Sequence, residues 1–286
     1  MKTLNRLVLL SALCYSTASV SAQIVLQWDS SPWNPSSPAG PFDYSVTVSG
    51  GTHTGSVWPD RYHGTITSAT GIDPASIGTG TGIPEGLFTY CYELTQYFYP
   101  SESVTYDVVP GATGINPYTL QFIGAVNSQL GTGIYGWLNP TNANMAAAVQ
   151  LGIWETLYDV GNPFDLSSGV NHGNFYLSNI ASLGSDPGSV GYYLGLFSGA
   201  MSGSSAVPAS SVVLLSNTSD PNQNGAGAQD QITAVRVPAR QTVPEPGTLL
   251  LAGLGIAMAI GRKRGMQRAI EAGPPGSSGS NRFRFR

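Results

Sequence analysis

The sequence predicts an α+β fold, a predominantly antiparallel β-sheet domain with an inserted helical segment carrying Gln150. Two patterns favour this class. Short apolar segments broken by Gly, Pro, Ser and Asn recur in the first half, and some alternate with period two, as strands with one solvated face do. Near the middle of the chain, apolar residues recur every third or fourth position, which indicates helices. We expect one such domain, spanning residues 23–240.

The N-terminal segment is typical of a secretory signal peptide. Two basic residues precede an apolar run, and small residues at positions 20–22 supply a cleavage site. We therefore predict that residues 1–22 are removed on export. Cys14 is lost with this segment, which leaves Cys91 as the single cysteine of the mature chain. Such a cysteine is either a small buried hydrophobe or a reactive thiol.

Segments with strand patterns lie on both sides of the helical region. The stretch Tyr44-Ser45-Val46-Thr47-Val48 alternates with period two, and a glycine-rich loop at 78–86 leads into an apolar stretch that places Cys91 on a strand. The predicted strands are 23–28, 42–48, 64–68, 87–92, 211–215 and 231–235, with a further hairpin within 93–109.

The clearest helical pattern covers residues 142–158. Asn142 can cap its N-terminus, and Asp159-Val160-Gly161 supplies a stop. Gln150 lies beside the apolar face of this helix, so we expect its carboxamide to be buried. One buried face is predicted from Met145, Val149, Ile153 and Leu157. Two further helices are predicted at 117–130 and 175–182.

A buried carboxamide without a partner costs about 1–3 kcal/mol, and Cys91 is the candidate partner of Gln150. The two residues lie in Tyr90-Cys91-Tyr92-Glu93 and Val149-Gln150-Leu151-Gly152-Ile153-Trp154. Together these stretches resemble the thioester domains of bacterial surface adhesins, which carry an aromatic-Cys-aromatic-acidic motif and an apolar-Gln-x-x-apolar-aromatic helix. The resemblance implies an internal thioester between Cys91 and Gln150 that traps a nucleophile on a target surface.

The implied chemistry needs few groups. The sulfur of Cys91 attacks the side-chain carbonyl carbon of Gln150, and ammonia leaves. Holding the two groups together lowers such a barrier by about 7–11 kcal/mol. Aromatic neighbours would exclude water, and a carboxylate would transfer protons unless it is merely solvated or paired along the helix. The candidate supporting residues are Tyr90, Tyr92, Trp154, Glu93 and Glu155.

The implied protein acts once and does not turn over, so we expect an acyl donor and not an enzyme, without cofactor or metal. Its partner would be an amine or hydroxyl of a protein or polysaccharide. Residues 23–243 contain three arginines, no lysine and fourteen acidic residues, a formal charge of −11. The negative electrostatic field of this region argues against nucleic acid as a partner, because nucleic acid is also negatively charged. Missing lysines protect an activated acyl group, but drift towards a low-lysine exported composition explains them equally simply.

The C-terminal segment combines a short motif, an apolar run and a basic cluster: Pro244-Glu245-Pro246, residues 248–260, and Arg262-Lys263-Arg264. The apolar run is short for a membrane helix, which needs about 20 residues, yet a basic cluster directly after it is typical of a stop-transfer signal. This arrangement resembles the PEP-CTERM sorting signal of Gram-negative bacteria. The resemblance implies an exosortase partner, transient anchoring in the inner membrane through residues 241–264, and delivery to the cell envelope or extracellular matrix. We expect residues 265–286 to be disordered.

The sequence is also compatible with two other functions. A cysteine hydrolase would pair Cys91 with His172, near Asn174, although nucleophilic cysteines usually lie at helix N-termini that lower the thiol pKa. A passive matrix or carbohydrate-binding module would instead use exposed tyrosines and tryptophans. Its stacking tryptophans would be Trp28, Trp33 and Trp58.

Overall fold

The chain divides into two compact units, residues 1–237 and 238–286, and the residues described below all belong to the first. The computed structural model describes residues 21–29, 41–78, 86–94, 96, 101–110, 113–131, 133–160, 164–168, 173–217 and 228–235.

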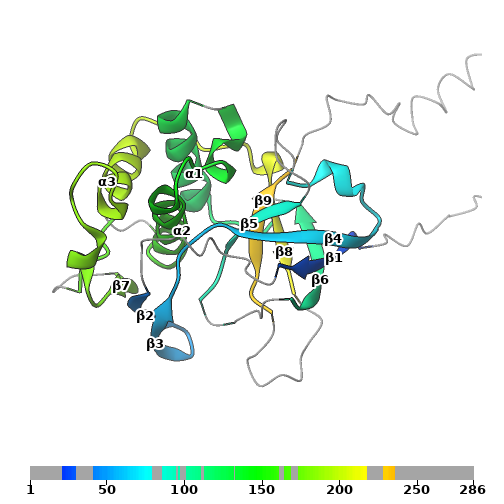
Figure 1. Cartoon of the computed structure of the whole chain (residues 1–286), viewed down its shortest axis with the longest axis horizontal. Helices are drawn as coiled ribbons and strands as arrows, with labels where there is room; N and C mark the ends of the chain where they lie inside the picture. The colour runs from blue at the N-terminus through cyan, green and yellow to red at the C-terminus, as the bar shows by residue number, and fades with distance from the viewer. Residues whose placement is uncertain are drawn as a thin grey trace, which may run out of the picture. The chain divides into compact units, whose positions relative to one another are not determined.

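A closed antiparallel barrel forms one side of this unit, and the helices form the other; in Figure 1 the barrel lies on the right and the helices on the left. Within the described residues its strands follow the order β1-β4-β5-β9-β8-β6, and β6 pairs with β1 to close it. The strands are β1 (Gln23–Trp28), β4 (Tyr62–Thr70), β5 (Leu87–Cys91), β6 (Ser103–Pro110), β8 (Val212–Ser216) and β9 (Gln231–Ala234). This order places β9, near the end of the domain, beside β5.

A smaller antiparallel sheet lies below the helices in Figure 1 and has the strand order β3-β2-β7. Its strands are β2 (Phe42–Val48), β3 (Gly51–Val57) and β7 (Phe175–Leu177). Phe42, Tyr44 and Val46 of β2 are buried and alternate with more polar positions, as the period-two pattern predicts. In contrast, β3 is largely exposed and was not predicted, because its sequence GTHTGSV has almost no apolar residues.

Among the described residues, three α-helices follow β6 in the chain and precede β8. They are α1 (Pro117–Leu130), α2 (Ala143–Tyr158) and α3 (Val190–Met201). The N-terminus of α1 is capped by Asn116, whose side chain accepts a hydrogen bond from the backbone N–H of Tyr118, and α1 ends at Gly131 with φ 64°. Asn142 caps α2 in the same way through the N–H of Met145.

Helix α2 is buried on all sides and not on one face alone. Every residue from Met145 to Thr156 is buried, because α1, α3 and strands β2 and β7 surround the helix. The close approach of α1 depends on Gly152, since a Cβ at this position would lie 1.9 Å from the ring of Phe122. The side chain of Gln150 is fully buried in the middle of this helix.

Two predicted elements differ from the structure. The helix predicted at 175–182 is strand β7 followed by a 3₁₀ turn, Ile180–Leu183, because Phe175 and Leu177 alternate with period two and pair with β2. Of the hairpin predicted within 93–109, the described residues contain one strand, β6, which pairs with β1 and β8, while residues 95 and 97–100 lie outside the described part of the chain. Strands hold 32% and helices 34% of the described residues, so the α+β class holds, but sheet does not predominate in this part of the chain.

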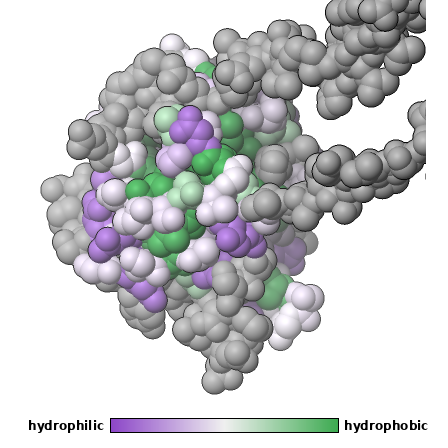
Figure 2. Space-filling view, turned by 90° about the vertical axis from the view of Figure 1, so that its right-hand side faces the viewer, coloured by the Kyte–Doolittle hydropathy of each residue, from purple (hydrophilic) through white to green (hydrophobic). Residues whose placement is uncertain are grey.

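The surface seen from the barrel side mixes hydrophobic and hydrophilic residues (Figure 2). Across the described residues, the exposed large hydrophobic side chains come mostly from separate segments. They are Trp58, Ile134, Val160, Ile180, Tyr192 and Leu196.

Candidate functional site

Cys91 ends β5 and lies on one face of the barrel wall with three other polar side chains. It is directly opposite Gln231 of β9, and two residues earlier Thr89 is opposite Tyr62 of β4. Because alternate residues of a strand share a face and opposite residues are neighbours, Tyr62, Thr89, Cys91 and Gln231 belong to one cluster. We call these four residues the Cys91 cluster. Each of them is buried, and Cys91 is 1% exposed.

The carboxamide of Gln231 is held by a different partner at each end. Its Nε2 donates to the backbone oxygen of Gln229 at 3.2 Å and to the Sγ of Cys91 at 3.4 Å. Its Oε1 accepts a hydrogen bond from the hydroxyl of Thr89 at 2.9 Å. A backbone carbonyl only accepts hydrogen bonds, so Gln229 determines which end of the amide is the nitrogen. The amide nitrogen therefore faces the sulfur while the carbonyl oxygen faces a donor.

Gln150 also meets Cys91, but through the backbone. The N–H of Cys91 donates to Oε1 of Gln150 at 2.8 Å, and Nε2 of Gln150 donates to the carbonyl oxygen of Cys91 at 2.8 Å. The pairing of β4 with β5 ends at Thr89, so the amide of Gln150 occupies the edge that β4 leaves uncovered. Since both backbone groups of Cys91 point away from β9, Cys91 and Gln231 form a non-hydrogen-bonded pair, in which opposite side chains lie closest.

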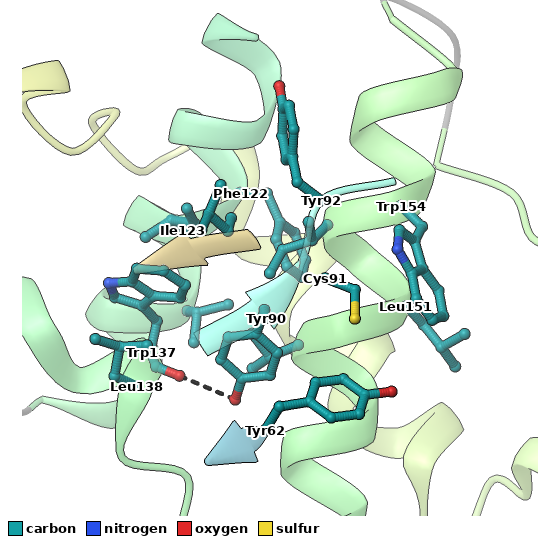
Figure 3. Packing of buried hydrophobic residues seen from close by; sticks show 14 of the residues in the cluster. Tyr62, Tyr90, Cys91, Tyr92, Phe122, Ile123, Trp137, Leu138, Leu151 and Trp154 are labelled. Atoms are coloured by element: carbon teal, nitrogen blue, oxygen red, sulfur yellow. Dashed lines mark hydrogen bonds between the residues drawn. The ribbon is translucent and has the colours of Figure 1, made fainter. Parts of the chain in front are cut away.

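The thiol of Cys91 is neutral at physiological pH. Burial raises its pKa to about 12, although hydrogen bonds with Gln231 and Tyr62 oppose the rise, and the charge of Glu93 adds to it. Figure 3 shows the sulfur directed towards Tyr62. The hydroxyl of Tyr62 donates its proton to the backbone oxygen of Trp58 at 2.8 Å. A buried neutral thiol of this kind is unlike the activated nucleophile of a cysteine hydrolase.

The two tyrosines beside Cys91 make their contacts elsewhere. Tyr90 stacks on Trp137 at 5.6 Å between ring centroids and donates to its backbone oxygen at 3.2 Å. Tyr92 points away from the sulfur in Figure 3, and its hydroxyl accepts from the N–H of Asn116 at 2.9 Å. Adjacent residues of a strand face opposite sides, so neither tyrosine shares the face of Cys91. Tyr62 is an aromatic residue that does meet the sulfur.

The remaining predicted supporting residues on the helix also have other contacts. Trp154 packs edge-on against Phe175 with ring centroids 6.3 Å apart. Glu155 is 1% exposed, and its Oε1 accepts from the N–H of Asp165 at 2.7 Å. Burial, and then the nearby carboxylate of Asp159, raise the pKa of Glu155 to about 8. Glu155 thus secures the loop that follows α2.

Glu93 lies at the edge of the Cys91 cluster. Its Oε1 accepts from the N–H of Asp230 at 3.3 Å, and its backbone oxygen accepts from the side chain of Gln229. Burial, followed by the charge of Asp230, raises its pKa. The charge of this carboxyl adds to the rise in the pKa of the Cys91 thiol that burial causes.

Sequence reasoning missed three of the four members of the Cys91 cluster. Gln231 opens a strand whose four residues, Gln-Ile-Thr-Ala, are all buried. A glutamine in such a strand indicates only weakly that its amide is buried and hydrogen-bonded in the folded protein. The roles of Thr89 and Tyr62 depend on strand register, which the sequence does not reveal.

Several predicted residues lie outside the described part of the chain: His172, Trp33, Pro244, Glu245, Pro246, Arg262, Lys263 and Arg264. The prediction that Trp28 is a surface stacking residue is wrong, because Trp28 is 1% exposed and packs edge-on against Tyr106 at 6.4 Å. In contrast, Trp58 is 48% exposed. Across the described ranges, no helix is long and apolar enough to span a bilayer, and the apolar run at 248–260 lies outside them.

Comparison with known proteins identifies the tail. Residues 242–264 match the PEP-CTERM protein-sorting motif. This match contains the Pro-Glu-Pro sequence, the apolar run and the basic cluster. A PEP-CTERM signal implies export, processing by an exosortase and transient membrane anchoring at the C-terminus. No curated protein and no solved structure gave a match to the chain.

Proposed function

We propose that the domain before the PEP-CTERM signal forms an internal thioester at Cys91 and uses it once to attach covalently to a surface or matrix nucleophile. The observation that carries this proposal is the 3.4 Å contact between Sγ of Cys91 and Nε2 of Gln231. The contact lies in a buried site between two directly paired strand residues. Such a site fixes the two reacting groups and keeps water away.

The contacts favour Gln231 over Gln150 as the acyl partner. Both polar atoms of the Gln150 amide bind the backbone of Cys91, whereas the amide nitrogen of Gln231 touches the sulfur itself. The carboxamide carbon of Gln231 is bonded to that nitrogen, so it lies one bond from an atom in contact with the nucleophile. In this proposal Gln150 positions Cys91, and Gln231 supplies the acyl group.

The reaction balances without any external reagent. A bond forms between the sulfur of Cys91 and the carboxamide carbon of Gln231, and the bond from this carbon to nitrogen breaks. The thiol proton passes to the departing nitrogen, which leaves as ammonia. A target amine or hydroxyl then attacks the same carbon, the carbon–sulfur bond breaks, and the sulfur takes up the proton of the nucleophile. The protein stays joined to its target, so it is not a catalyst.

Methylamine tests the proposal directly. The protein is exported from a host with an exosortase, treated with methylamine and digested, and modified peptides are mapped by mass spectrometry. We expect methylamide on Gln231 in the wild type and no adduct in Cys91→Ala. Peptide mapping is required because cyclisation of an N-terminal Gln23 also loses one ammonia.

The outcomes separate the two glutamines. An adduct on Gln150 would assign the acyl group to the helix, as the sequence motif predicts. If both glutamines stay unmodified while Cys91 alkylates as an ordinary thiol in denaturant, the thioester proposal is wrong.

The second candidate is a passive matrix or carbohydrate-binding module, and the 48% exposure of Trp58 favours it. An indole ring on the surface offers a stacking face to a sugar. This candidate predicts that attachment to matrix survives Cys91→Ala and is lost in Trp58→Ala. The covalent proposal predicts the opposite dependence for attachment that resists denaturant.

A further inference from the structure

We propose that Thr89 takes part directly in the thioester chemistry, acting as the hydrogen-bond donor to the acyl carbonyl oxygen. This inference rests on the proposed function with Gln231 as the acyl partner. Its basis is the 2.9 Å hydrogen bond from the hydroxyl of Thr89 to Oε1 of Gln231.

The geometry places donor, nucleophile and acyl group on one face of two paired strands. Thr89 precedes Cys91 by two residues in β5, so both side chains are on the same face, and Gln231 is directly opposite Cys91 in β9. Thr89 and Gln231 are 0% exposed. The hydrogen bond is therefore formed by groups on a rigid scaffold in a site that excludes water.

The hydroxyl binds the oxygen on which negative charge develops. When the sulfur attacks the carboxamide carbon, the π electrons of the carbonyl move onto Oε1, which becomes an oxyanion. A fixed donor at about 2.7–3.1 Å stabilises this charge more than it stabilises the neutral carbonyl. Thr89 keeps its own proton throughout. The same oxygen carries charge again when an amine attacks the thioester, so Thr89 acts on both formation and capture.

A buried threonine hydroxyl needs a hydrogen-bond acceptor in any case, and the fold supplies a matched comparison. Thr233 of β9 is also 0% exposed, and its hydroxyl donates to the backbone oxygen of Phe88 at 2.7 Å. The residue type and the burial are the same, and each hydroxyl donates to a carbonyl oxygen, which belongs to a side-chain amide for Thr89 and to the backbone for Thr233. The acceptor of Thr233, however, takes no part in the reaction. Comparing Thr89 with Thr233 separates a role in the chemistry from a role in folding.

The experiment measures how fast methylamine is incorporated at Gln231 in the full exported chain. Valine replaces the hydroxyl by a methyl group of similar size, so Thr89→Val removes the donor with little change in volume. We expect incorporation to slow about 10²- to 10³-fold, as on loss of one oxyanion donor. Thr89→Ser keeps the donor and should stay within a few-fold of wild type, and Thr233→Val should react at nearly the wild-type rate.

Thr89→Val reacting as fast as wild type, with the adduct still on Gln231, overturns the role of Thr89 and leaves the thioester intact. Equal slowing in Thr89→Val and Thr233→Val also overturns it, because a general packing defect would then be the cause. An adduct on Gln150 in the wild type overturns it as well, whereas no adduct at all refutes the proposed function itself. Thr89→Ala supplies a second hydroxyl-free variant should Thr89→Val not fold.

Discussion

The amide of Gln150 replaces a β-strand at the backbone of Cys91, accepting one hydrogen bond and donating another, each 2.8 Å long. A side chain from the middle of α2 thereby completes the pairing of the last residue of β5, where the contact with β4 has ended. The helix and the barrel are thus joined at the one cysteine of the described chain.

Removing this amide should destabilise the domain and release the end of β5. Gln150→Ala leaves a buried N–H and a buried C=O without partners, each costing about 1–3 kcal/mol. We expect the free energy of unfolding in urea to fall by about 2–4 kcal/mol. The control is Gln121→Ala on α1, which removes one half-buried hydrogen bond to the backbone oxygen of Met201 and should cost less. Equal losses in the two variants would contradict a special role for Gln150.

Alanine substitutions at two helical glycines should change the free energy of unfolding in opposite directions. At Gly152 an added methyl group meets the ring of Phe122, which is held by the rings of Phe164 and Phe197. We expect Gly152→Ala to lower the free energy of unfolding by about 1–3 kcal/mol, as overpacking does. Gly195 on α3 is exposed, and an added Cβ would meet no atom within 4 Å, so Gly195→Ala should raise the free energy of unfolding by about 0.5–1 kcal/mol. Thermal or urea unfolding of both variants checks the signs.

The stability of the domain should fall as the pH rises through the titration range of Glu155. The pKa of this carboxyl is about 8 in the folded protein against 4.5 as its ordinary value, because burial and then Asp159 disfavour the charged form. Between these two values the folded state binds more protons than the unfolded state. The contribution of Glu155 is therefore present below the lower pKa and is lost as the pH approaches the higher one.

This prediction is checked by urea unfolding at several pH values between 5 and 8, which are about the two limits of the effect. Glu155→Gln keeps an acceptor for the N–H of Asp165 and does not ionise. The wild type should lose up to about 1.4 kcal/mol per pH unit more than the variant. Parallel pH profiles of the two proteins would show that Glu155 is not buried as a neutral acid.

Processing of the protein should depend on the PEP-CTERM motif. Replacing Pro244, Glu245 and Pro246 together by alanine removes the motif but keeps the apolar run and the basic cluster. We expect the variant to stay uncleaved in the membrane fraction, while the wild type is processed and released from it, as immunoblots of fractionated cells would show. Replacing Arg262, Lys263 and Arg264 tests retention separately. Wild-type processing of the triple alanine variant would contradict the role of the motif.

The sequence predicts helices better than it predicts the site. Helix α2 could be located because its cap at Asn142, its apolar periodicity and its stop coincide in one continuous stretch. The contact of Cys91 with Gln231 joins residues 140 positions apart, and it exists only because β5 and β9 pair in one register. A shift of one residue would turn Gln231 to the other face. No local pattern contains this information.

The environment of Gln150 could be predicted only in part. Burial of this amide beside Cys91 could be inferred, because Gln150 lies among apolar neighbours on a helix. Whether the amide meets the sulfur or the backbone depends on where β4 stops along β5, which is a property of the assembled barrel. The PEP-CTERM signal could be predicted from the sequence alone, since its motif, apolar run and basic cluster are adjacent in the chain.

The order of strands in the barrel also determines when, during export, Cys91 and Gln231 can come into contact. Cys91 lies in β5, but its neighbour Gln231 opens β9, the last strand of the described domain. A polypeptide that crosses the membrane unfolded and from its N-terminus delivers β9 after every other strand of the barrel. The sulfur and the amide therefore meet only when the whole domain has reached the far side. Any bond between them would form outside the cytoplasm, where the amines of the cell interior can no longer consume it.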